Sequence, residues 1–206
     1  MIIAVDGPTA SGKGTIAKAI AAHFELPYLD TGLLYRAVGY QTVADGGDPD
    51  NPQDALEACN FRSDLLRSSA LRSEETGGYA SRVSTHPEVR KALYERQRAF
   101  AEQEGGAVLD GRDIGTVIAP EADVKLFITA SVQERAKRRW LEMRGREIEI
   151  PLSDIERDIA ARDARDINRK DAPLRAAPDA LVIDTTAFDK DQAIEAAIEA
   201  VTQALR

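Results

Sequence analysis

Ile2-Ile3-Ala4-Val5-Asp6-Gly7-Pro8-Thr9-Ala10-Ser11-Gly12-Lys13-Gly14-Thr15, near the start of a chain of 206 residues, is the stretch that decides the fold. Its first four residues are apolar and are followed by Asp6-Gly7-Pro8, which predicts a short buried strand that ends in a turn. Apolar residues then recur at helical spacing from Lys13 to Phe24, so we expect a helix directly after the turn. A strand, a glycine-rich turn and a helix in this order are typical of an α/β protein.

The turn itself, Gly7 to Lys13, has the spacing G-x-x-x-x-G-K of a phosphate-binding loop. Glycines let the backbone wrap round a phosphate, so that its N–H groups and the N-terminus of the next helix point at the anion. We expect Lys13 to place a positive charge at the β and γ phosphates. The bound phosphates would belong to a nucleotide. The residues predicted to contact it are Gly7, Pro8, Thr9, Ala10, Ser11, Gly12, Lys13, Gly14 and Thr15.

One position departs from the common form of this loop. Gly14 follows the lysine, where Ser or Thr usually supplies a hydroxyl ligand to Mg²⁺, and Thr15 comes one residue later. We therefore expect Mg²⁺ to be carried by ATP, with Thr15 reaching it through water and no side chain bound to it directly. The residues alone leave open a glycine-rich strand–helix turn that carries a surface lysine.

Short apolar segments and amphipathic segments alternate along the rest of the chain. More strands are predicted at residues 27–30, 107–110, 124–128 and 181–184, and more helices at 31–43, 87–103, 131–144, 153–169 and 192–205. Residues 48–86 are polar and interrupted, and we expect short helices there. Strands of four or five apolar residues between helices predict a five-stranded parallel sheet covered on both faces, in one α/β domain of residues 1–206.

The composition restricts the class of protein. There are 27 basic and 35 acidic residues, so the net charge of −8 argues against a nucleic-acid or anionic-membrane surface. Arginine nevertheless outnumbers lysine by 20 to 7, and ten of the 27 cations fall within residues 135–169, which suggests a small phosphorylated ligand. The single cysteine, Cys59, rules out an intramolecular disulfide, and no export signal or membrane span is evident, so we expect a cytoplasmic protein.

Several further motifs are spread over nearly the whole chain. They are Asp6-Gly7-Pro8 with Ser11-Gly12-Lys13-Gly14-Thr15, Asp30-Thr31-Gly32 with Tyr35-Arg36, Asp110-Gly111-Arg112-Asp113-Ile114-Gly115-Thr116, Arg162-Asp163-x-x-Asp166-x-x-Arg169, Ala172-Pro173-Leu174, and Asp179-Ala180 with Ile183-Asp184-Thr185. In type and order they resemble the motifs of the bacterial cytidylate kinases, within the nucleoside monophosphate kinase group of phosphate-loop proteins. The resemblance implies transfer of the γ-phosphoryl group of ATP to CMP or dCMP, giving CDP or dCDP and ADP. It also implies a nucleotide-binding insertion at about residues 48–86, shorter than is usual in the family, and a closing lid at about residues 144–152.

The resemblance implies roles for single side chains as well. Arg36 and Arg112 hold the phosphate of the acceptor, and Thr31 lies at its base or phosphate. The catalytic residues are Lys13, Arg112 and Asp110, of which Asp110 orders Mg²⁺ through water. The other acceptor-binding residues are Ser81, Arg90 and Asp113 for the base, Arg162 and Asp166 for the ribose, and Arg169.

These positions have structural alternatives when the residues are taken alone. Thr31 can be the N-cap of the helix that follows it, and Asp110 can be a turn aspartate. Arg162, Asp166 and Arg169 lie at i, i+4 and i+7, so they share one helix face. That spacing equally builds an exposed stripe of ion pairs.

The base is the part of the acceptor that separates CMP from UMP. Cytosine presents an amine donor where uracil presents a carbonyl, and its N3 accepts a hydrogen bond instead of donating one. A selective pocket therefore needs a carboxylate, for which Asp113 is the candidate, and a donor, for which Arg90 is the candidate with Ser81 as a weaker helper. Asp113 can alternatively be a turn residue paired with a nearby arginine.

Arginines also flank the predicted lid. They are Arg135, Arg138, Arg139, Arg144 and Arg146. We expect two or three of them to reach the transferring phosphoryl group and the others to form a solvated face.

Other functions remain open at this level. A kinase of the same fold that acts on UMP, AMP or shikimate is the nearest alternative. A GTP-dependent switch protein is more distant, because Asn168-Arg169-Lys170-Asp171 does not match the guanine-reading sequence Asn-Lys-x-Asp. We expect a monomer that binds small molecules and neither nucleic acid nor membrane.

Overall fold

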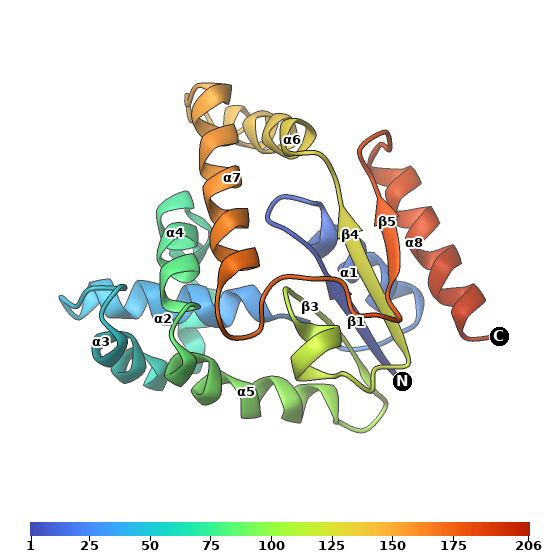
Figure 1. The fold of residues 1–206 in the computed structure, drawn as a ribbon, viewed down its shortest axis with the longest axis horizontal. Coiled ribbons are helices and arrows are strands. Elements are labelled where there is room, and N and C mark those ends of the chain that lie inside the picture. The colour runs from blue at the N-terminus through green and yellow to red at the C-terminus, as the bar shows by residue number, and fades with distance from the viewer.

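The computed structural model describes residues 1–206 as five strands surrounded by helices (Figure 1). The strands are β1 (Ile2–Asp6), β2 (Tyr28–Asp30), β3 (Ala107–Gly111), β4 (Val124–Thr129) and β5 (Leu181–Asp184). The helices are α1 (Lys13–His23), α2 (Thr31–Ala44), α3 (Pro52–Glu57), α4 (Glu74–Val83), α5 (Pro87–Ala101), α6 (Val132–Arg144), α7 (Leu152–Asn168) and α8 (Lys190–Ala204). A π-helical segment, Ile114–Ile118, follows β3.

The strands form one parallel sheet in the order β2-β3-β1-β4-β5, which confirms the predicted fold class. β1 lies in the middle, and its Val5 pairs with Asp110 of β3. Asp30, the last residue of β2, pairs with Asp110 from the other side. Because the strands are parallel, their carboxyl ends meet at one edge of the sheet, where open α/β sheets bind ligands. The carboxylates at these strand ends are therefore brought together at that edge.

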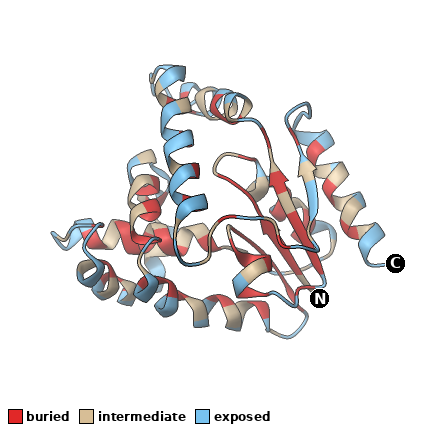
Figure 2. Ribbon diagram, in the orientation of Figure 1, coloured by how far each residue is buried: buried red, intermediate tan, exposed pale blue.

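Successive side chains of a strand point to opposite faces of the sheet, so the sheet contributes to two cores. Ile3 and Val5 of β1 pack against α1 and α8 on one face. Ala4 points to the other face, where it packs with Leu109 of β3, α5 and the π-helical segment. The central strands are accordingly buried, while the outer faces of the helices are exposed (Figure 2). This is the two-sided covering that the short apolar strands predict.

Two groups of helices extend from the sheet, and each has a small core of its own. The group α2–α5, with three short 3-10 turns between α3 and α4, encloses Val38 and Leu71. α6 and α7 pack on each other through Ala136 and Ile159. The short helices expected within residues 48–86 are present. None of the helices has both the length and the apolar character needed to cross a lipid bilayer.

Two predictions about helix ends are wrong. Thr31 is the first residue of α2, and Asp30 is its N-cap. The Thr31 hydroxyl does not cap the helix, because it donates to the backbone carbonyl of Asp110 in β3 (2.7 Å). α7 ends at Asn168, so Arg162 and Asp166 share a helix face but Arg169, with extended backbone, lies beyond it. The chain turns back there, and the Leu174 N–H donates to the carbonyl of Asp166 (2.8 Å).

Three further differences follow from position in the sheet and from capping. β5 is an edge strand with α8 on one side, so Val182 is 60% exposed although the sequence predicts a covered strand. The π-helical segment after β3 was not predicted, because its five residues carry no helical pattern of their own. α8 begins at Lys190, two residues early, because Asp189 and Gln192 form a reciprocal capping box.

Candidate active site

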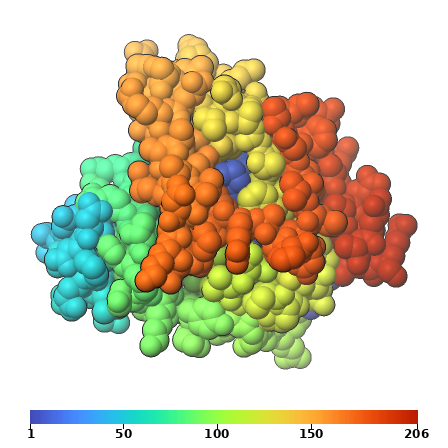
Figure 3. Space-filling view, in the orientation of Figure 1, coloured from blue at the N-terminus to red at the C-terminus, as the bar shows by residue number.

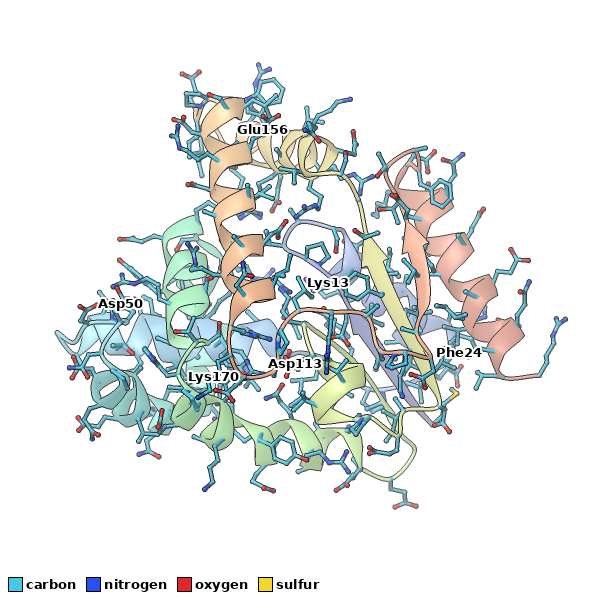
Figure 4. The ribbon with its side chains drawn as sticks, in the orientation of Figure 1. Lys13, Phe24, Asp50, Asp113, Glu156 and Lys170 are labelled. Carbon is cyan, nitrogen blue, oxygen red and sulfur yellow. The ribbon has the colours of Figure 1, made fainter.

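A cavity of about 680 Å³ opens at the carboxyl edge of the sheet, between α4 and α7 on one side and α6 and the start of α8 on the other. In Figure 3 the N-terminal residues, in blue, are visible at the bottom of this hollow. The predicted site residues that line it are Thr9, Ala10, Ser11, Gly12, Lys13, Gly14, Thr15, Thr31, Arg36, Ser81, Arg90, Asp110, Arg112, Asp113, Arg162, Asp166 and Arg169. Gly7 and Pro8 belong to the loop but not to the lining of the cavity. Figure 4 shows Lys13 and Asp113 both in this central region.

The loop between β1 and α1 has the geometry of an anion-binding turn. Gly7 passes so close to β4 that a Cβ there would lie 2.1 Å from the carbonyl oxygen of Ile128. Gly12 is left-handed (φ 86°) and precedes the first turn of α1, whose N–H groups point into the loop. The Ser11 hydroxyl is buried without a hydrogen-bond partner. A phosphate in the loop would supply the acceptor that these donors lack.

Lys13 and Asp110 form the charged centre of the cavity. Burial, together with the positive charge of Arg112, lowers the pKa of Lys13 to about 8. Burial raises the pKa of Asp110 to about 6 against the opposing charge of Lys13. The Tyr28 hydroxyl donates to Asp110, and Gly14 gives the carboxylate room, since a Cβ there would lie 3.2 Å from its Oδ2. A side chain at the usual Ser or Thr position would therefore crowd Asp110.

Asp6 joins the phosphate loop to the segment after β3. Its Oδ1 accepts the N–H of Ile114 and its Oδ2 accepts the N–H of Gly115, both at 2.8 Å. Burial raises the pKa of Asp6 to about 7, and the two backbone donors oppose that rise. The sequence showed Asp6 within a motif without assigning it a role. Its structural role is to hold the residues that follow Asp113.

One group of arginines faces the cavity from α2, α7 and the end of β3. Arg112 donates from Nε to Oδ2 of Asp166 (2.9 Å), and Arg36 donates to the backbone carbonyls of Leu71 (2.7 Å) and Ser73 (2.9 Å). Burial opposes ionisation of Asp166, but Arg112 holds the pKa of that carboxyl below its usual range.

Arg162 makes no hydrogen bond or ion pair within the chain, although it lies beside the other two arginines. Burial, followed by the charges of Arg112 and Arg36, lowers the pKa of Arg162 to about 10. No carboxylate lies within ion-pair distance of this cation, although the charge of Asp166 partly opposes the lowering of its pKa. The group Arg36, Arg112 and Arg162 is therefore suited to an anion from outside the chain. The alternative of an exposed stripe of ion pairs is wrong for Arg162 and Asp166, because both line the cavity and Asp166 is buried.

A second ion-pair group surrounds Asp113. Arg90 donates to its Oδ2 and Arg169 to its Oδ1 (3.3 Å), and all three side chains are buried. Arg90 also lies over the ring of Tyr35, 5.6 Å from its centroid, and its Nη1 is buried without a partner. Ser81 accepts a hydrogen bond from Arg165 (3.1 Å). Asp113 is thus both paired with arginines and part of the cavity wall, so the two interpretations of it are compatible.

The arginines near the predicted lid do different things. Arg135 is buried and donates to Asp163 (2.6 Å) and to the Thr9 carbonyl (3.0 Å), so it fixes α6 to α7 and to the phosphate loop. Arg138 and Arg139 line the cavity, and Arg139 pairs with Glu74 of α4. Arg144, the last residue of α6, and Arg146, in the loop after it, are exposed. The prediction that each of the five arginines either reaches the transferring phosphoryl group or belongs to a solvated face is therefore wrong for Arg135, which is buried and paired within the chain.

Other lining residues were not singled out from the sequence. They are Asp30 at the end of β2, Tyr35 of α2, Glu74 of α4, Asp158 of α7, and Phe188, Asp189 and Lys190 before and at the start of α8. Asp30 and Tyr35 both belong to the motif Asp30-Thr31-Gly32 with Tyr35-Arg36, which was a usable signal. The others depend on how distant helices meet. Within the chain, no group of three or more His, Cys, Asp or Glu side chains is placed to hold a metal ion.

Comparison with known proteins agrees with this geometry. The model of the family "Cytidylate kinase" matches residues 3–203. A cytidylate kinase of Cereibacter sphaeroides is 56% identical over 199 residues, which are 97% of this chain and 94% of the relative. A cytidylate kinase of Methylocella silvestris is 51% identical over 207 residues, covering 99% of this chain and 95% of the relative.

Solved structures share the fold at much lower identity. A gluconokinase from Sinorhizobium meliloti superimposes with a TM-score of 0.56 at 14% identity, covering 98% of this chain and 91% of its own. A protein from Eubacterium ventriosum gives a TM-score of 0.57 at 17% identity, with 98% of both chains covered. These likenesses concern the fold alone. With the family match over nearly the full length and relatives above half identity, the chain belongs to the cytidylate kinase family.

Proposed function

We propose that this chain transfers the γ-phosphoryl group of ATP to CMP or dCMP. The observation that carries the proposal is one cavity that joins a phosphate loop to a pocket of three arginines and a buried carboxylate. Two anionic substrates have to be brought into line, and their charge neutralised, for phosphoryl transfer to proceed. The two ends of the cavity supply these two requirements separately.

The donor ATP is assigned to the phosphate-loop end. The backbone N–H groups at the start of α1, the Ser11 hydroxyl and Lys13 would hold its β and γ phosphates. From there the cavity continues to Phe188 and Lys190, which would flank the nucleoside. Thr15 and Asp110 would contact Mg²⁺ through water, since both line this end and supply the oxygen atoms that Mg²⁺ prefers. The ion would neutralise charge between the phosphates.

The acceptor phosphate is assigned to Arg36 and Arg112, as the family resemblance implies, and also to Arg162. The resemblance implies the ribose for Arg162, but its guanidinium lies beside that of Arg36 and has no ion-pair partner, which favours the phosphate. Asp166 remains the candidate for the ribose. The oxygen of the acceptor phosphate is already anionic, so the chain does not need a general base to activate it. That oxygen forms a bond to the γ phosphorus while the bond from phosphorus to the oxygen bridging to the β phosphate breaks, which gives CDP and ADP. Arginines supply fixed positive charge to the oxygens that gain charge during this exchange.

The acceptor base is assigned to the pocket around Asp113. The unpartnered Nη1 of Arg90 is a buried donor that can bond to N3 of cytosine. Asp113, which Arg90 and Arg169 hold by ion pairs, is placed to accept from the exocyclic amine. Uracil would set its own N3–H against the Arg90 donor and its carbonyl against Asp113. These two mismatches are the basis for preferring cytosine.

The acceptor-binding insertion at about residues 48–86 and the lid at about residues 144–152 are parts of the same proposal. The stretch between α6 and α7, residues 145–151, is a loop, and the helices on either side of it carry Arg138, Arg139 and Arg162. Closure would bring the first two toward the γ phosphate and exclude water from the transfer. The chain is proposed to act on small molecules as a monomer.

A coupled ADP-release assay over CMP, dCMP, UMP, AMP and shikimate tests the proposal. CMP and dCMP should be the best acceptors by kcat/KM. UMP should be poorer by roughly two orders of magnitude, because each unpaired buried polar group costs about 1–3 kcal/mol. AMP and shikimate should give no turnover above background. A higher kcat/KM for UMP, AMP or shikimate than for CMP would contradict the assignment.

A further inference from the structure

A glycine in the middle of α4 needs a different explanation from most glycines. α4 contains Gly77 and Gly78 in succession, and each costs a helix about 1 kcal/mol relative to alanine. Neither has a positive φ, so the backbone conformation does not require glycine at either position. The reason for Gly77 therefore lies in what surrounds it.

Gly77 faces two guanidinium groups of the cavity. A Cβ at this position would lie 2.8 Å from Nη2 of Arg36 and 3.2 Å from Nη1 of Arg162. Arg36 comes from α2 and Arg162 from α7, so three helices meet at this residue. By contrast, a Cβ at Gly78 would have no atom within 4 Å. Two adjacent glycines of one helix thus have opposite surroundings.

The atoms in contact decide what a side chain at Gly77 would disturb. The nearest atoms are the ends of long, flexible side chains, which can move without shifting the backbone. Gly39 of α2 provides the contrast, because a Cβ there would lie 2.8 Å from the backbone of Tyr79. A methyl group at Gly77 would consequently leave the fold in place and displace the guanidinium groups.

The two arginines have no carboxylate partner that could hold them after such a displacement. Arg36 is fixed through Nη1 to two backbone carbonyls, and Arg162 makes no hydrogen bond within the chain. Burial, followed by the positive charges of Arg139 and Arg112, lowers the pKa of Arg36, and burial with the charges of Arg112 and Arg36 lowers the pKa of Arg162. The position of the Arg162 guanidinium thus depends on the space beside α4, and that of Arg36 on the same space and on two backbone hydrogen bonds.

We propose that Gly77 is a positioning residue of the acceptor site, which leaves room for Arg36 and Arg162 to lie side by side and receive the acceptor's phosphate. This inference rests on the proposed function, in which those arginines bind that phosphate. Gly77 itself touches no substrate. It acts through the two guanidinium groups, and its effect is specific to the phosphate and not to the nucleoside.

Gly77→Ala with Gly78→Ala as the matched control tests the proposal. Gly77→Ala should raise the KM for CMP at least tenfold, because displacement of a positioning group by about 1 Å costs up to two orders of magnitude. The KM for ATP and the inhibition constant of cytidine, which lacks the phosphate, should stay within about twofold of wild type. Gly78→Ala should leave all three constants unchanged.

Two results would overturn the proposal. One is a KM for CMP in Gly77→Ala that matches the Gly78→Ala value. The other is an equal weakening of CMP, cytidine and ATP, which would show that the whole site had been disturbed. Failure of the proposed function is distinguishable from both, because the wild-type chain would then not phosphorylate CMP.

A double variant covers the case in which Gly77→Ala does not fold. Arg36→Ala removes the guanidinium that the new methyl group would meet at 2.8 Å. Gly77→Ala in that background should therefore fold with a melting temperature close to that of Arg36→Ala alone. If Gly77→Ala does fold, its effect on the KM for CMP should shrink to less than threefold in the Arg36→Ala background. A double variant that stays unfolded, or an unchanged effect on KM, would overturn the proposal.

Discussion

The two ends of the cavity are built in different ways. The donor end is made by residues 7–15, a continuous stretch that uses backbone N–H groups, the Ser11 hydroxyl and Lys13. The acceptor end is assembled from α2, α4, α5, α7 and the segment after β3, which contribute side chains from positions far apart in the sequence. One end is therefore a local structure, and the other exists only when several elements pack together.

The two ends also differ in how their polar groups are satisfied without ligand. At the acceptor end several charges already have partners, as in Arg112 with Asp166 and Asp113 with Arg90 and Arg169, while Arg162 and Nη1 of Arg90 have none. At the donor end the Ser11 hydroxyl is buried without a partner. Preformed ion pairs fix side-chain geometry and so favour discrimination between acceptors, whereas free donors favour strong binding of any polyphosphate.

The largest expected effect tests the donor end. Lys13→Ala should lower kcat by two orders of magnitude or more, because it removes the cation placed at the transferring phosphate. The fold should persist, since burial already disfavours the charged form of Lys13. Lys18→Ala, an exposed lysine on the same helix, is the matched control and should be near wild type. Steady-state kinetics and a thermal melt measure both.

Retention of more than about a tenth of the wild-type kcat, an effect of less than about 1.4 kcal/mol, would remove Lys13 from the mechanism. It would also remove the contrast between the two ends, because the donor end would then depend on its backbone alone.

The second prediction, a change of about tenfold in acceptor selectivity, concerns the acceptor end. Asp113→Asn removes the charge, keeps the shape, and lets the new amide donate to a uracil carbonyl. The ratio of kcat/KM for CMP to that for UMP should narrow by at least a factor of ten. The free energy of unfolding should fall by about 1–3 kcal/mol, since two buried arginines lose a charged partner. Asp171→Asn, an exposed aspartate beyond α7, serves as the control.

If kcat/KM falls by the same factor for CMP and for UMP, so that their ratio is unchanged, Asp113 does not recognise the base. The residue would then serve to hold Arg90 and Arg169, and selectivity would have to come from another part of the acceptor end.

The smallest effect concerns Asp110, where the two ends meet. With a pKa of about 6, its carboxylate is mostly ionised at pH 7 and mostly protonated at pH 5.5, so kcat/KM should fall about fourfold between them. In Asp110→Asn, kcat/KM should be lower at every pH, and its fall between pH 7 and pH 5.5 should disappear. Titration of the substrates themselves is common to both enzymes and cancels in the comparison.

The same group makes a prediction for stability. Its folded pKa lies above the unfolded value of 3.8, so the folded chain binds more protons between about pH 4 and 6. The free energy of unfolding of the ligand-free chain should therefore fall as pH rises through this range, and fall less in Asp110→Asn. A denaturant titration at each pH measures it, and identical slopes in the two proteins would contradict the assignment.

The accuracy of prediction from sequence follows the same division. The phosphate loop was predictable residue by residue, because strand, glycines, lysine and helix are contiguous. Arg36, Arg112 and Asp113 were identified only by the family resemblance, since spacing alone leaves them as surface or turn residues. Thr31 was misplaced as an N-cap because the partner that its hydroxyl chooses, the Asp110 carbonyl, comes from another strand.

The sequence by itself determined the α/β class, the phosphate loop and the family, because these depend on local patterns of apolar residues, glycines and motifs. The tertiary structure alone decided that Arg162 lacks an internal partner, that Asp6 holds the segment after Asp113, and that Gly77 and not Gly78 faces two arginines. These facts depend on the distances between helices and strands remote in sequence. Such distances are set by packing of the whole core, and no local pattern encodes them.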